Sequence, residues 1–580
     1  TTAGNNTGIG AFALRVNTTG TSNTAVGTES LTANTTANYN TAHGHKALKA
    51  NTTGAGNTAT GFVSLTANTT GSYNSGHGSE TLYSNTTGAN NTASGVQALY
   101  FNTTASYNTA TGYRSLFYNT TGASNTAVGW YSLFSNTTGG NNVAIGTSAL
   151  QDATTSVGNT AIGTSAGANV TTGTGENVMV GNRAGFGVTT GAQNIIIGDN
   201  ACANGTMTGG SNVIIGDNAG ISHTSAPQNT GVGANTLANT TTGGYNTAIG
   251  KSAGNAITTG TGNAFLGLGA GSLTTTGVAN TFVGGSHASY AGASNTTGGQ
   301  NTGIGTDALR SNTTANYNTA VGTKSLFSNT TGTNNTAVGY QALKSNTTAD
   351  RNTAVGTSTL LANTTGVRNA GFGSYALRFN TTGGENTAVG DSALYSNTTG
   401  LHNTSVGFQS LKTNTTGQQN TAVGQDSLFA NTTGSYNTAV GKNALVNNTT
   451  ASYNTAFGDR ALHANTTGVS NVGIGHYALH ATTTGGANTA IGTNASDTNT
   501  TGSSNTVVGY EALTTSTTGS NNVAMGRSSL FSCTTGSYNT AVGKSSANSI
   551  TTGEENVAVG YYAGNQSEVI QLTTQTNRIA

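Results

Sequence analysis

The sequence predicts an all-β protein that folds as a parallel β-solenoid, or β-roll, with about 17 residues in each coil. One observation behind this prediction is that asparagine recurs every 17 residues from Asn6 to Asn556. Only three of the 32 steps differ, and they are 18 residues into Asn177, 18 into Asn212 and 21 into Asn301. The other observation is that small and apolar residues alternate after each asparagine, which is typical of short β-strands.

Each repeat follows the consensus N-T-A-V-G-x-x-A-L-x-x-N-T-T-G-x-x, whose positions are numbered 1 to 17 from the recurrent asparagine. Positions 2–4 predict a strand, and the glycine at position 5 ends it. Leucine at position 9 indicates a second short strand, and N-T-T-G forms the turn that closes the coil. We expect core columns of Val or Ile at position 4 and of Leu at position 9, with Ala at positions 3 and 8.

The composition excludes several other classes of protein. With 18 Lys and Arg, 17 Asp and Glu and a net charge of +1, the chain lacks the basic surface that binds nucleic acid. The apolar positions do not follow a helical period, and 86 glycines disfavour helices. Because no run of 18 apolar residues occurs, we expect no insertion into a membrane.

The regularity of the repeats divides the chain into four segments. Residues 1–158 and 301–564 are predicted to be regular solenoid repeats, and residues 159–300 an irregular stretch with an insertion. In some irregular coils Gly replaces Leu at position 9 while an apolar residue replaces Asn at position 12. This exchange indicates that both positions reach one interior of fixed volume. Residues 565–580 are predicted to be a terminal segment that leads to a further domain.

Asparagine at position 12 is predicted to stack on its equivalents in neighbouring coils, because identical amides one coil apart can form hydrogen-bonded ladders. The same asparagines begin N-T-T triplets, which match the acceptor pattern for N-glycosylation. Both alternatives stay open at this point. The candidate glycosylation sites are Asn34, Asn51, Asn68, Asn312 and Asn329.

Aromatic residues recur at two positions of the repeat. Columns of tyrosine at position 17 are candidate contacts for a receptor, since exposed aromatic rings can stack on sugars. Aromatic residues at position 10, such as Phe117 and Phe134, form a similar column, and the alternative for both columns is that the rings cover neighbouring coils and stack on each other. The candidate receptor contacts at position 17 are Tyr39, Tyr73, Tyr107, Tyr317, Tyr436, Tyr453 and Tyr538.

In five consecutive coils the residue at position 4 is polar instead of apolar. A buried polar file needs partners, so the simpler interpretation is a solvated or self-satisfied column. The alternative is an axial ion site in which copies of His43 or His77 from several chains converge. The five residues are His43, Thr60, His77, Ser94 and Thr111.

No catalytic arrangement is predicted, and we expect the protein not to be an enzyme. The few carboxylates are scattered and form no acid/base pair. No metal-binding or phosphate-binding motif occurs, so no cofactor is predicted. The two cysteines, Cys202 and Cys533, lie about 19 repeats apart, which excludes a disulfide between them in a linear stack.

Two kinds of known repeat resemble this one. Residues 142–146 (N-V-A-I-G) and 522–526 (N-V-A-M-G) resemble repeats of trimeric autotransporter adhesin heads. The full unit at residues 335–348 resembles the repeats of phage tail-fibre-like proteins. The resemblance covers residues 4–564 and implies a homotrimer of parallel β-rolls. It also implies that residues 569–580 lead into a self-cleaving chaperone domain.

These observations predict a structural protein, the shaft of a phage-type tail fibre that spaces or presents a host-attachment element. The alternative is a cell-surface adhesin or a self-assembling extracellular filament. The expected partner is the chain itself, as a homotrimer or filament, together with glycans or a receptor on a host surface. The expected location is extracellular or on the surface of a virion.

Overall fold

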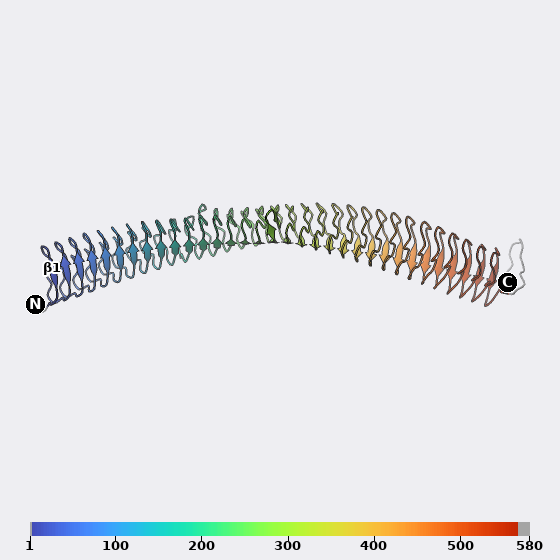
Figure 1. Ribbon diagram of the computed structural model, residues 1–580, viewed down its shortest axis with the longest axis horizontal. Coiled ribbons are helices and arrows are strands. Elements are labelled where there is room, and N and C mark those ends of the chain that lie inside the picture. Colours follow the sequence, from blue (N-terminus) through green and yellow to red (C-terminus); the bar gives the residue numbers. More distant parts are fainter. Residues whose placement is uncertain (1–2, 566–580) are drawn as a thin grey trace. The chain divides into compact units, whose positions relative to one another are not determined.

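A computed structural model describes residues 3–565, and this part of the chain is an all-β parallel β-solenoid of about 33 coils at intervals of about 17 residues (Figure 1). The described residues form two units, 3–298 and 299–565. The boundary between them lies beside the predicted change of regularity at residue 300. Apart from Asn565, the predicted terminal segment lies outside the described residues.

The first unit contains one three-residue strand in each coil, and each strand pairs in parallel with the strand of the next coil. Equivalent residues lie opposite one another, so Thr7 pairs with Thr24 and Ile9 with Val26. The strands of this unit are β1 (Thr7–Ile9), β2 (Thr24–Val26), β3 (Thr41–His43), β4 (Thr58–Thr60), β5 (Ser75–His77), β6 (Thr92–Ser94), β7 (Thr109–Thr111), β8 (Thr126–Val128), β9 (Val143–Ile145), β10 (Thr160–Ile162), β11 (Val178–Val180), β12 (Ile195–Ile197), β13 (Val213–Ile215), β14 (Thr230–Val232), β15 (Thr247–Ile249), β16 (Ala264–Leu266) and β17 (Thr281–Val283).

A short antiparallel hairpin interrupts the last coil of this unit and accounts for its 21-residue step. It consists of β18 (Gly285–Ser286) and β19 (Ser289–Tyr290).

The second unit repeats the parallel arrangement without such an insertion. Its strands are β20 (Thr302–Ile304), β21 (Thr319–Val321), β22 (Thr336–Val338), β23 (Thr353–Val355), β24 (Ala370–Phe372), β25 (Thr387–Val389), β26 (Thr404–Val406), β27 (Thr421–Val423), β28 (Thr438–Val440), β29 (Thr455–Phe457), β30 (Val472–Ile474), β31 (Thr489–Ile491), β32 (Thr506–Val508), β33 (Val523–Met525), β34 (Thr540–Val542) and β35 (Val557–Val559).

The strands face the opposite way from the sequence prediction. From the second coil on, the residue at position 3 is buried, whereas the residue at position 4 is half-buried or exposed in every described coil. The expected core column of Val and Ile at position 4 is therefore wrong. The alanines expected in the core at position 3 do lie inside.

Leucine at position 9 is in the core, as predicted, but it does not belong to a strand. It lies in a turn with left-handed backbone angles, and φ of these leucines is between 47° and 53°. Side chains such as Leu31 and Leu326 are fully enclosed, and burying one leucine contributes about 1.5–3 kcal/mol. The core leucine offsets the cost of a backbone conformation that L-residues avoid. The predicted second strand is therefore wrong.

The coils without this leucine fill their interior from other positions. In three of them the glycine at position 9 is accompanied by a buried apolar residue at position 12, namely Val170, Val188 or Ile257. A large residue can also replace alanine at position 3, as Met179 does in the coil of Val188 and Phe265 does in the coil of Gly271. A Cβ atom added to Gly271 would lie 2.6 Å from the ring of Phe265, so the two positions share one space.

Two ladders of asparagine amides run along each unit, and the predicted stacking at position 12 is present. Nδ2 of Asn51 donates to Oδ1 of Asn34 at 3.1 Å and to the carbonyl of Gly54 at 2.9 Å. At position 1, the backbone N–H of Asn40 donates to Oδ1 of Asn23 at 2.9 Å. Because the buried amides find partners in the next coil, their burial leaves few polar groups unpaired.

Glycine at position 5 lets consecutive coils approach closely. Gly339 has a φ of 134°, and an added Cβ would lie 2.5 Å from the carbonyl oxygen of Gly356 in the next coil. An L-side chain is excluded here by both the backbone angle and the space. The glycine column therefore ends the strand at the same repeat position in every coil.

Candidate interaction surfaces

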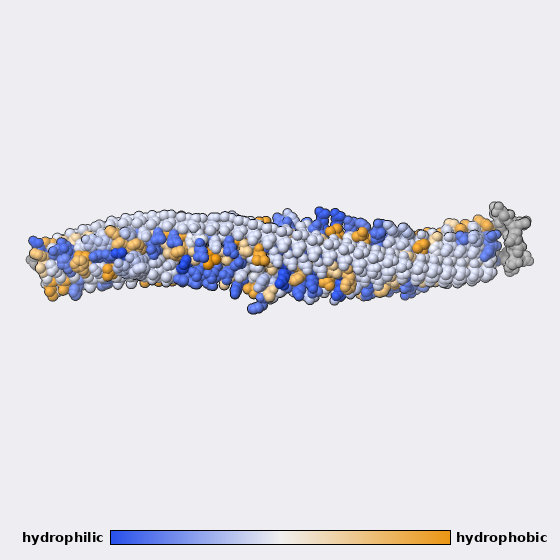
Figure 2. All heavy atoms as spheres, turned by 90° about the horizontal axis from the view of Figure 1, so that it is seen from above, coloured by the Kyte–Doolittle hydropathy of each residue, from blue (hydrophilic) through white to orange (hydrophobic). Residues whose placement is uncertain are grey.

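The outward face of the strands carries an exposed apolar column. We call this surface the sheet face and define it by the side chains at positions 2 and 4. Ile162 is 39% exposed, Phe372 41% and Phe457 56%, although all three are large apolar residues. Figure 2 shows hydrophobic side chains at the surface among hydrophilic ones. Since monomeric proteins rarely expose long contiguous apolar surfaces, the sheet face is a candidate interface.

The five polar residues at position 4 interrupt this column in β3–β7. We call them the polar block, and they are His43, Thr60, His77, Ser94 and Thr111. All five are exposed or half-buried, which agrees with a solvated column in the single chain. Nε2 of His77 lies 3.0 Å from the hydroxyl of Ser75.

The two histidines of the polar block do not meet within one chain. His43 ends β3 and His77 ends β5, with β4 between them. Among the described residues, no group of three or more His, Cys, Asp or Glu side chains is placed to hold a metal ion. The axial ion site therefore stays a prediction that requires several copies of the chain.

The tyrosines at position 17 point outward. The seven predicted candidates are between 42% and 69% exposed, with Tyr39 the most exposed. They have left-handed backbone angles, such as a φ of 64° at Tyr453. Tyr436 and Tyr453 stack with ring centroids 5.0 Å apart. Contact with a receptor stays a prediction, and the exposure is what such contact requires.

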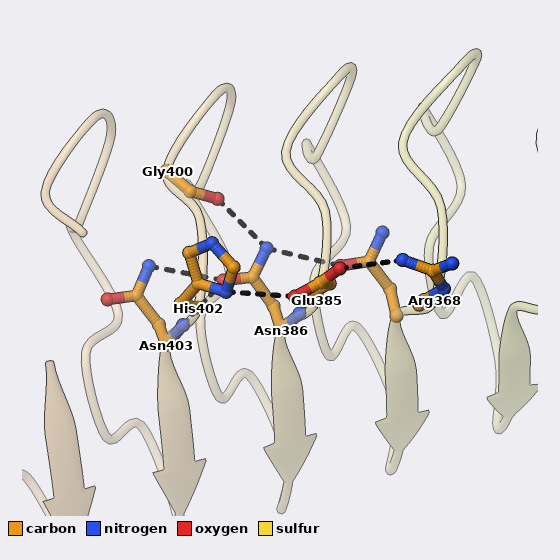
Figure 3. Close-up of polar contacts among 7 residues, drawn as sticks. Arg368, Glu385, Asn386, Gly400, His402 and Asn403 are labelled. Atoms are coloured by element: carbon orange, nitrogen blue, oxygen red, sulfur yellow. Dashed lines mark hydrogen bonds and ion pairs between the residues drawn. The ribbon is translucent and has the colours of Figure 1, made fainter. Parts of the chain in front are cut away.

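In several coils of the second unit, charged or titratable residues occupy position 17 in place of tyrosine, and three consecutive ones, Arg368, Glu385 and His402, contact one another. Nη1 of Arg368 lies 2.8 Å from Oε1 of Glu385, and Nδ1 of His402 lies 3.0 Å from Oε2 of the same carboxylate. Figure 3 shows them coil by coil beside the amide ladder of Asn386 and Asn403. All three side chains are largely exposed, so the file contributes little to stability.

This charged file borders a shallow hollow of about 210 Å³. The hollow exists because Gly384 has no side chain between Val367 and Leu401 at position 16. Charges of opposite sign that lie one period apart reveal this file in the sequence. It was not identified in the sequence analysis. The lining residues are Thr365, Val367, Thr382, Gly384, Glu385, Leu401 and His402.

The aromatic residues at position 10 stack on each other, as the alternative interpretation expects. The ring centroids of Tyr83 and Tyr100 are 4.9 Å apart, those of Tyr100 and Phe117 are 5.3 Å apart, and those of Phe117 and Phe134 are 5.4 Å apart. Burial raises the pKa of the Tyr100 hydroxyl. The ring faces are therefore covered by neighbouring rings and serve packing between coils.

A polar file at position 7 runs beside this aromatic ladder, and sequence reasoning missed it. Nε2 of Gln97 donates to Glu80 at 2.7 Å, and Nε of Arg114 donates to Oε1 of Gln97 at 2.6 Å. Nη1 of Arg114 reaches the hydroxyl of Tyr131 at 3.3 Å. The single tryptophan, Trp130, is 51% exposed next to this file. Tyr131 links this file to the aromatic ladder, because its ring contacts both Trp130 and Phe134.

The asparagines proposed for glycosylation are enclosed. Asn34, Asn51, Asn68, Asn312 and Asn329 are all fully buried. Nδ2 of Asn68 donates to Asn51 at 2.8 Å and to the carbonyl of Gly71 at 2.9 Å, so the acceptor nitrogen is already used. Glycosylation of these residues stays a prediction, and it would have to precede folding of the coil.

The two cysteines are free, as predicted. Cys202 and Cys533 are both buried, and neither forms a disulfide. Burial raises the pKa of the Cys202 thiol to about 12. Both thiols therefore act as small apolar core groups rather than as nucleophiles.

A cluster of histidines covers three coils near the end of the second unit. The ring centroids of His463 and His480 are 5.0 Å apart, and Nδ1 of His480 lies 3.5 Å from a carboxylate oxygen of Asp497. Burial lowers the pKa of both histidines and raises the pKa of Asp497. The lowered pKa values of the two histidines favour neutral imidazoles, whose rings pack against each other at an angle of 31°.

Comparison with known proteins adds no relationship to this description. No protein-family model matches the chain, and no curated protein matches it. Within residues 3–565, no helix is long and apolar enough to cross a membrane. By its own repeats and its own structure, the chain is a tandem-repeat β-solenoid with a period of about 17 residues.

Proposed function

We propose that this chain is the structural shaft of a phage-type tail fibre, in which three copies associate through their sheet faces. In this role it spaces or presents a host-attachment element. Its place is then the surface of a virion, outside the cell. The homotrimer and the location are parts of the same proposal.

The exposed apolar column at position 4 is the observation that carries this proposal. In the second unit all sixteen residues of the column are apolar, from Ile304 to Val559. None of them is buried in the single chain. Covering this surface with the same surface of other copies would remove it from water, and burial of apolar area is favourable by roughly 25 cal/mol per Å².

The shape of the sheet face supports association about a common axis. The apolar column is one side chain wide, because threonine usually occupies position 2 and glycine occupies position 5. The glycines, such as Gly339, bring the backbone itself to the surface beside the column. Such a narrow apolar column, with exposed backbone beside it, suits an arrangement in which a few chains meet at a common axis. It suits a broad contact between two flat sheets less well.

The internal structure also supports a mechanical role. Each coil offers the next one the same strand edge, leucine and amides, so stability accumulates along the chain by contacts between neighbours. The amide ladders continue through successive coils, as from Asn329 to Asn346 to Asn363 at 2.9 Å and 3.0 Å. Such an array keeps its cross-section while its length is set by the number of repeats.

The test is the mass of the native particle together with a change in the sheet face. We expect light scattering to give three times the chain mass of 57.3 kDa. Changing Val321, Val338 and Val355 to Asp places charges in the proposed interface and should reduce the particle to single chains. The matched control changes Thr331, Thr348 and Thr365, which lie at position 14 of the same coils, to Asp.

The control should remain a trimer with an unchanged circular dichroism spectrum. A native protein that has the mass of one chain would contradict the proposal. An aspartate variant that stays trimeric while retaining its β-structure would show that the copies associate elsewhere. The spectrum separates loss of association from loss of folding.

A cell-surface adhesin or a self-assembling extracellular filament is the second candidate function. The exposed tyrosines at position 17 favour it, since an aromatic column of this kind suits binding to a surface. Negative-stain images of the same sample separate the candidates. Discrete particles favour the tail fibre, whereas filaments of indefinite length favour the second candidate.

A further inference from the structure

We propose that the polar block aligns the copies of this chain, so that they associate parallel to one another and in register. The inference rests on the proposed association through the sheet face and adds what fixes its geometry. The partner at this surface is a second copy of the same chain. The residues responsible are His43, Thr60, His77, Ser94 and Thr111.

The polar block divides the sheet face of the first unit unequally. Two coils with apolar residues at position 4, Ile9 and Val26, precede it. Ten coils with apolar residues, from Val128 to Val283, follow it. The order of polar and apolar side chains therefore differs when the column is read from its two ends, and this gives the face a direction.

Position 2 strengthens the contrast. In the coils of the polar block this position is also polar, as at Thr41 in β3 and Ser75 in β5. In β9 and β11–β13 both outward positions are apolar, with pairs such as Val143 and Ile145. The first unit thus has one stretch that is polar at both outward positions and another in which most coils are apolar at both.

Only one parallel alignment matches these stretches completely. A shift by one coil would place His43 of one copy against Val26 of the other, and Thr111 against Val128. Each mismatch buries a polar group without a polar partner, which is unfavourable. Polar side chains at single core positions fix the register of coiled coils by the same effect, at some cost in stability.

An antiparallel alignment can match the polar block only at the expense of the remaining column. Centred on His77, it would place Val26 of one copy opposite Val128 of the other. Strands β1–β9 would then find partners, but β10–β17 would not. The coils that are apolar at both outward positions would largely stay in water, whereas parallel alignment in register covers them all.

Cysteine cross-linking of the full chain tests the alignment. Val26→Cys and Val128→Cys flank the polar block on the sheet face, and the native Cys202 and Cys533 are buried. After mild oxidation of each variant alone, we expect disulfide-linked pairs of chains. When the two variants are assembled together, we expect no link between position 26 of one chain and position 128 of another.

A second chain removes the polar block by changing all five residues to Val in the Val26→Cys background. We expect its particle mass to be unchanged and its specific cross-link to be lost, because slipped alignments no longer bury polar groups. The matched control changes five exposed threonines at position 14 of the same coils to Val and should keep the cross-link. These threonines are Thr53, Thr70, Thr87, Thr104 and Thr121.

The outcomes separate this inference from the proposed function. A link between positions 26 and 128 would overturn the inference by showing antiparallel pairing. A full cross-link in the chain without the polar block would also overturn it, because register would then be set elsewhere. In both cases the particle remains a multimer and the proposed function stands. A native particle with the mass of one chain would overturn both.

Discussion

At the scale of single residues, the asparagine that usually occupies position 12 bonds the carbonyl three residues later. His223 makes the same bond in the one described coil where histidine replaces asparagine. Its Nε2 lies 3.0 Å from the carbonyl of Ala226, as Nδ2 of Asn34 lies 3.1 Å from that of Ala37. The other ring nitrogen of His223 is buried and has no partner among the described residues. The imidazole is therefore tolerated only while it is neutral.

This arrangement predicts that acid weakens the coil around His223. Burial lowers the pKa of His223 in the folded chain, so the unfolded chain binds the proton more readily. The coil should keep its full stability above the unfolded pKa of about 6.5 and lose it as pH falls below that value. Hydrogen exchange of residues 212–228 at pH 7.5 and pH 5.0 measures the change.

The matched control is His223→Asn, which restores the usual residue and has no group that titrates in this range. Its local exchange should show no extra opening at pH 5.0 once the intrinsic pH dependence is removed. If both proteins open equally, the histidine is not the cause. Burial lowers the pKa of His463 and His480 in the second unit as well, so acid also affects that part of the chain. The exchange must therefore be measured in the coil of His223 itself.

At the scale of the coil, positions 3 and 9 share one interior. Most coils combine Ala with Leu, whereas some combine a large residue with Gly, as in the pair of Met179 and Gly185. A Cβ atom on Gly185 would lie 2.5 Å from the sulfur of Met179. Close-packed interiors leave no room for two very large side chains at this point, and where both residues are small, as in Ala161 and Gly167, an apolar residue at position 12 fills the space.

The exchange can be reproduced in a regular coil. Leu326→Gly should destabilise the second unit by about 2–5 kcal/mol, the usual cost of removing a buried leucine. Ala320→Phe should also destabilise it, by about 1–3 kcal/mol, since it overfills the same space. The double variant should be more stable than the sum of the two changes implies. Chemical denaturation of the four proteins as a double-mutant cycle gives the coupling.

A favourable coupling of about 1 kcal/mol or more is expected for residues in direct contact. Changes that add without coupling would show that the two side chains fill separate spaces. Ala320→Phe combined with Leu343→Gly, which lies in the next coil, is the control for a general effect of glycine.

Much of the coil could be predicted from the sequence, because spacing alone fixes it. The period, the core leucine and the asparagine ladders all follow from residues that recur at one interval. The outward orientation of position 4 could not be predicted, because hydropathy places Val inside. Inside the coil, Leu and two amides already fill the space, so position 3 usually has room for only a methyl group and Val faces outward.

The candidate surfaces could be predicted only in part. The tyrosines at position 17 were found because they repeat, and the polar block because it breaks a repeat. The files at Arg368, Glu385 and His402 and at Glu80, Gln97 and Arg114 were missed, because their members are different residue types. They become visible only when residues 17 apart are compared in pairs, since such residues are neighbours in space.

At the scale of the whole molecule, each unit is an array in which every coil contacts only its neighbours. Removing one complete period should therefore be tolerated. Deletion of residues 335–351 would bring Val321 opposite Val355 and Asn329 next to Asn363, with the same contacts as before. We expect the shortened chain to keep its circular dichroism spectrum and to lose only the small share of stability that one coil contributes.

Deletion of nine residues, 335–343, is the control. It removes half a coil, so strands would lie opposite turns of the neighbouring coil. The asparagines of the ladders would no longer lie next to one another. We expect loss of β-structure and strong local hydrogen exchange in this variant. Equal tolerance of both deletions would show that the coils do not depend on a shared register.

The asparagine ladder at position 12 also has a direction, because each amide in it donates back to the asparagine of the coil before it, as Asn51 does to Asn34. Where the file stops, as before Ala153 and Thr482, the last oxygens are left without a donor among the described residues, at Asn136 and Asn465. Each finished coil therefore displays ready acceptors to the coil that comes later in the chain. A ribosome releases the chain in that same order, so synthesis and the ladder proceed in one direction, and each new coil is templated by its predecessor.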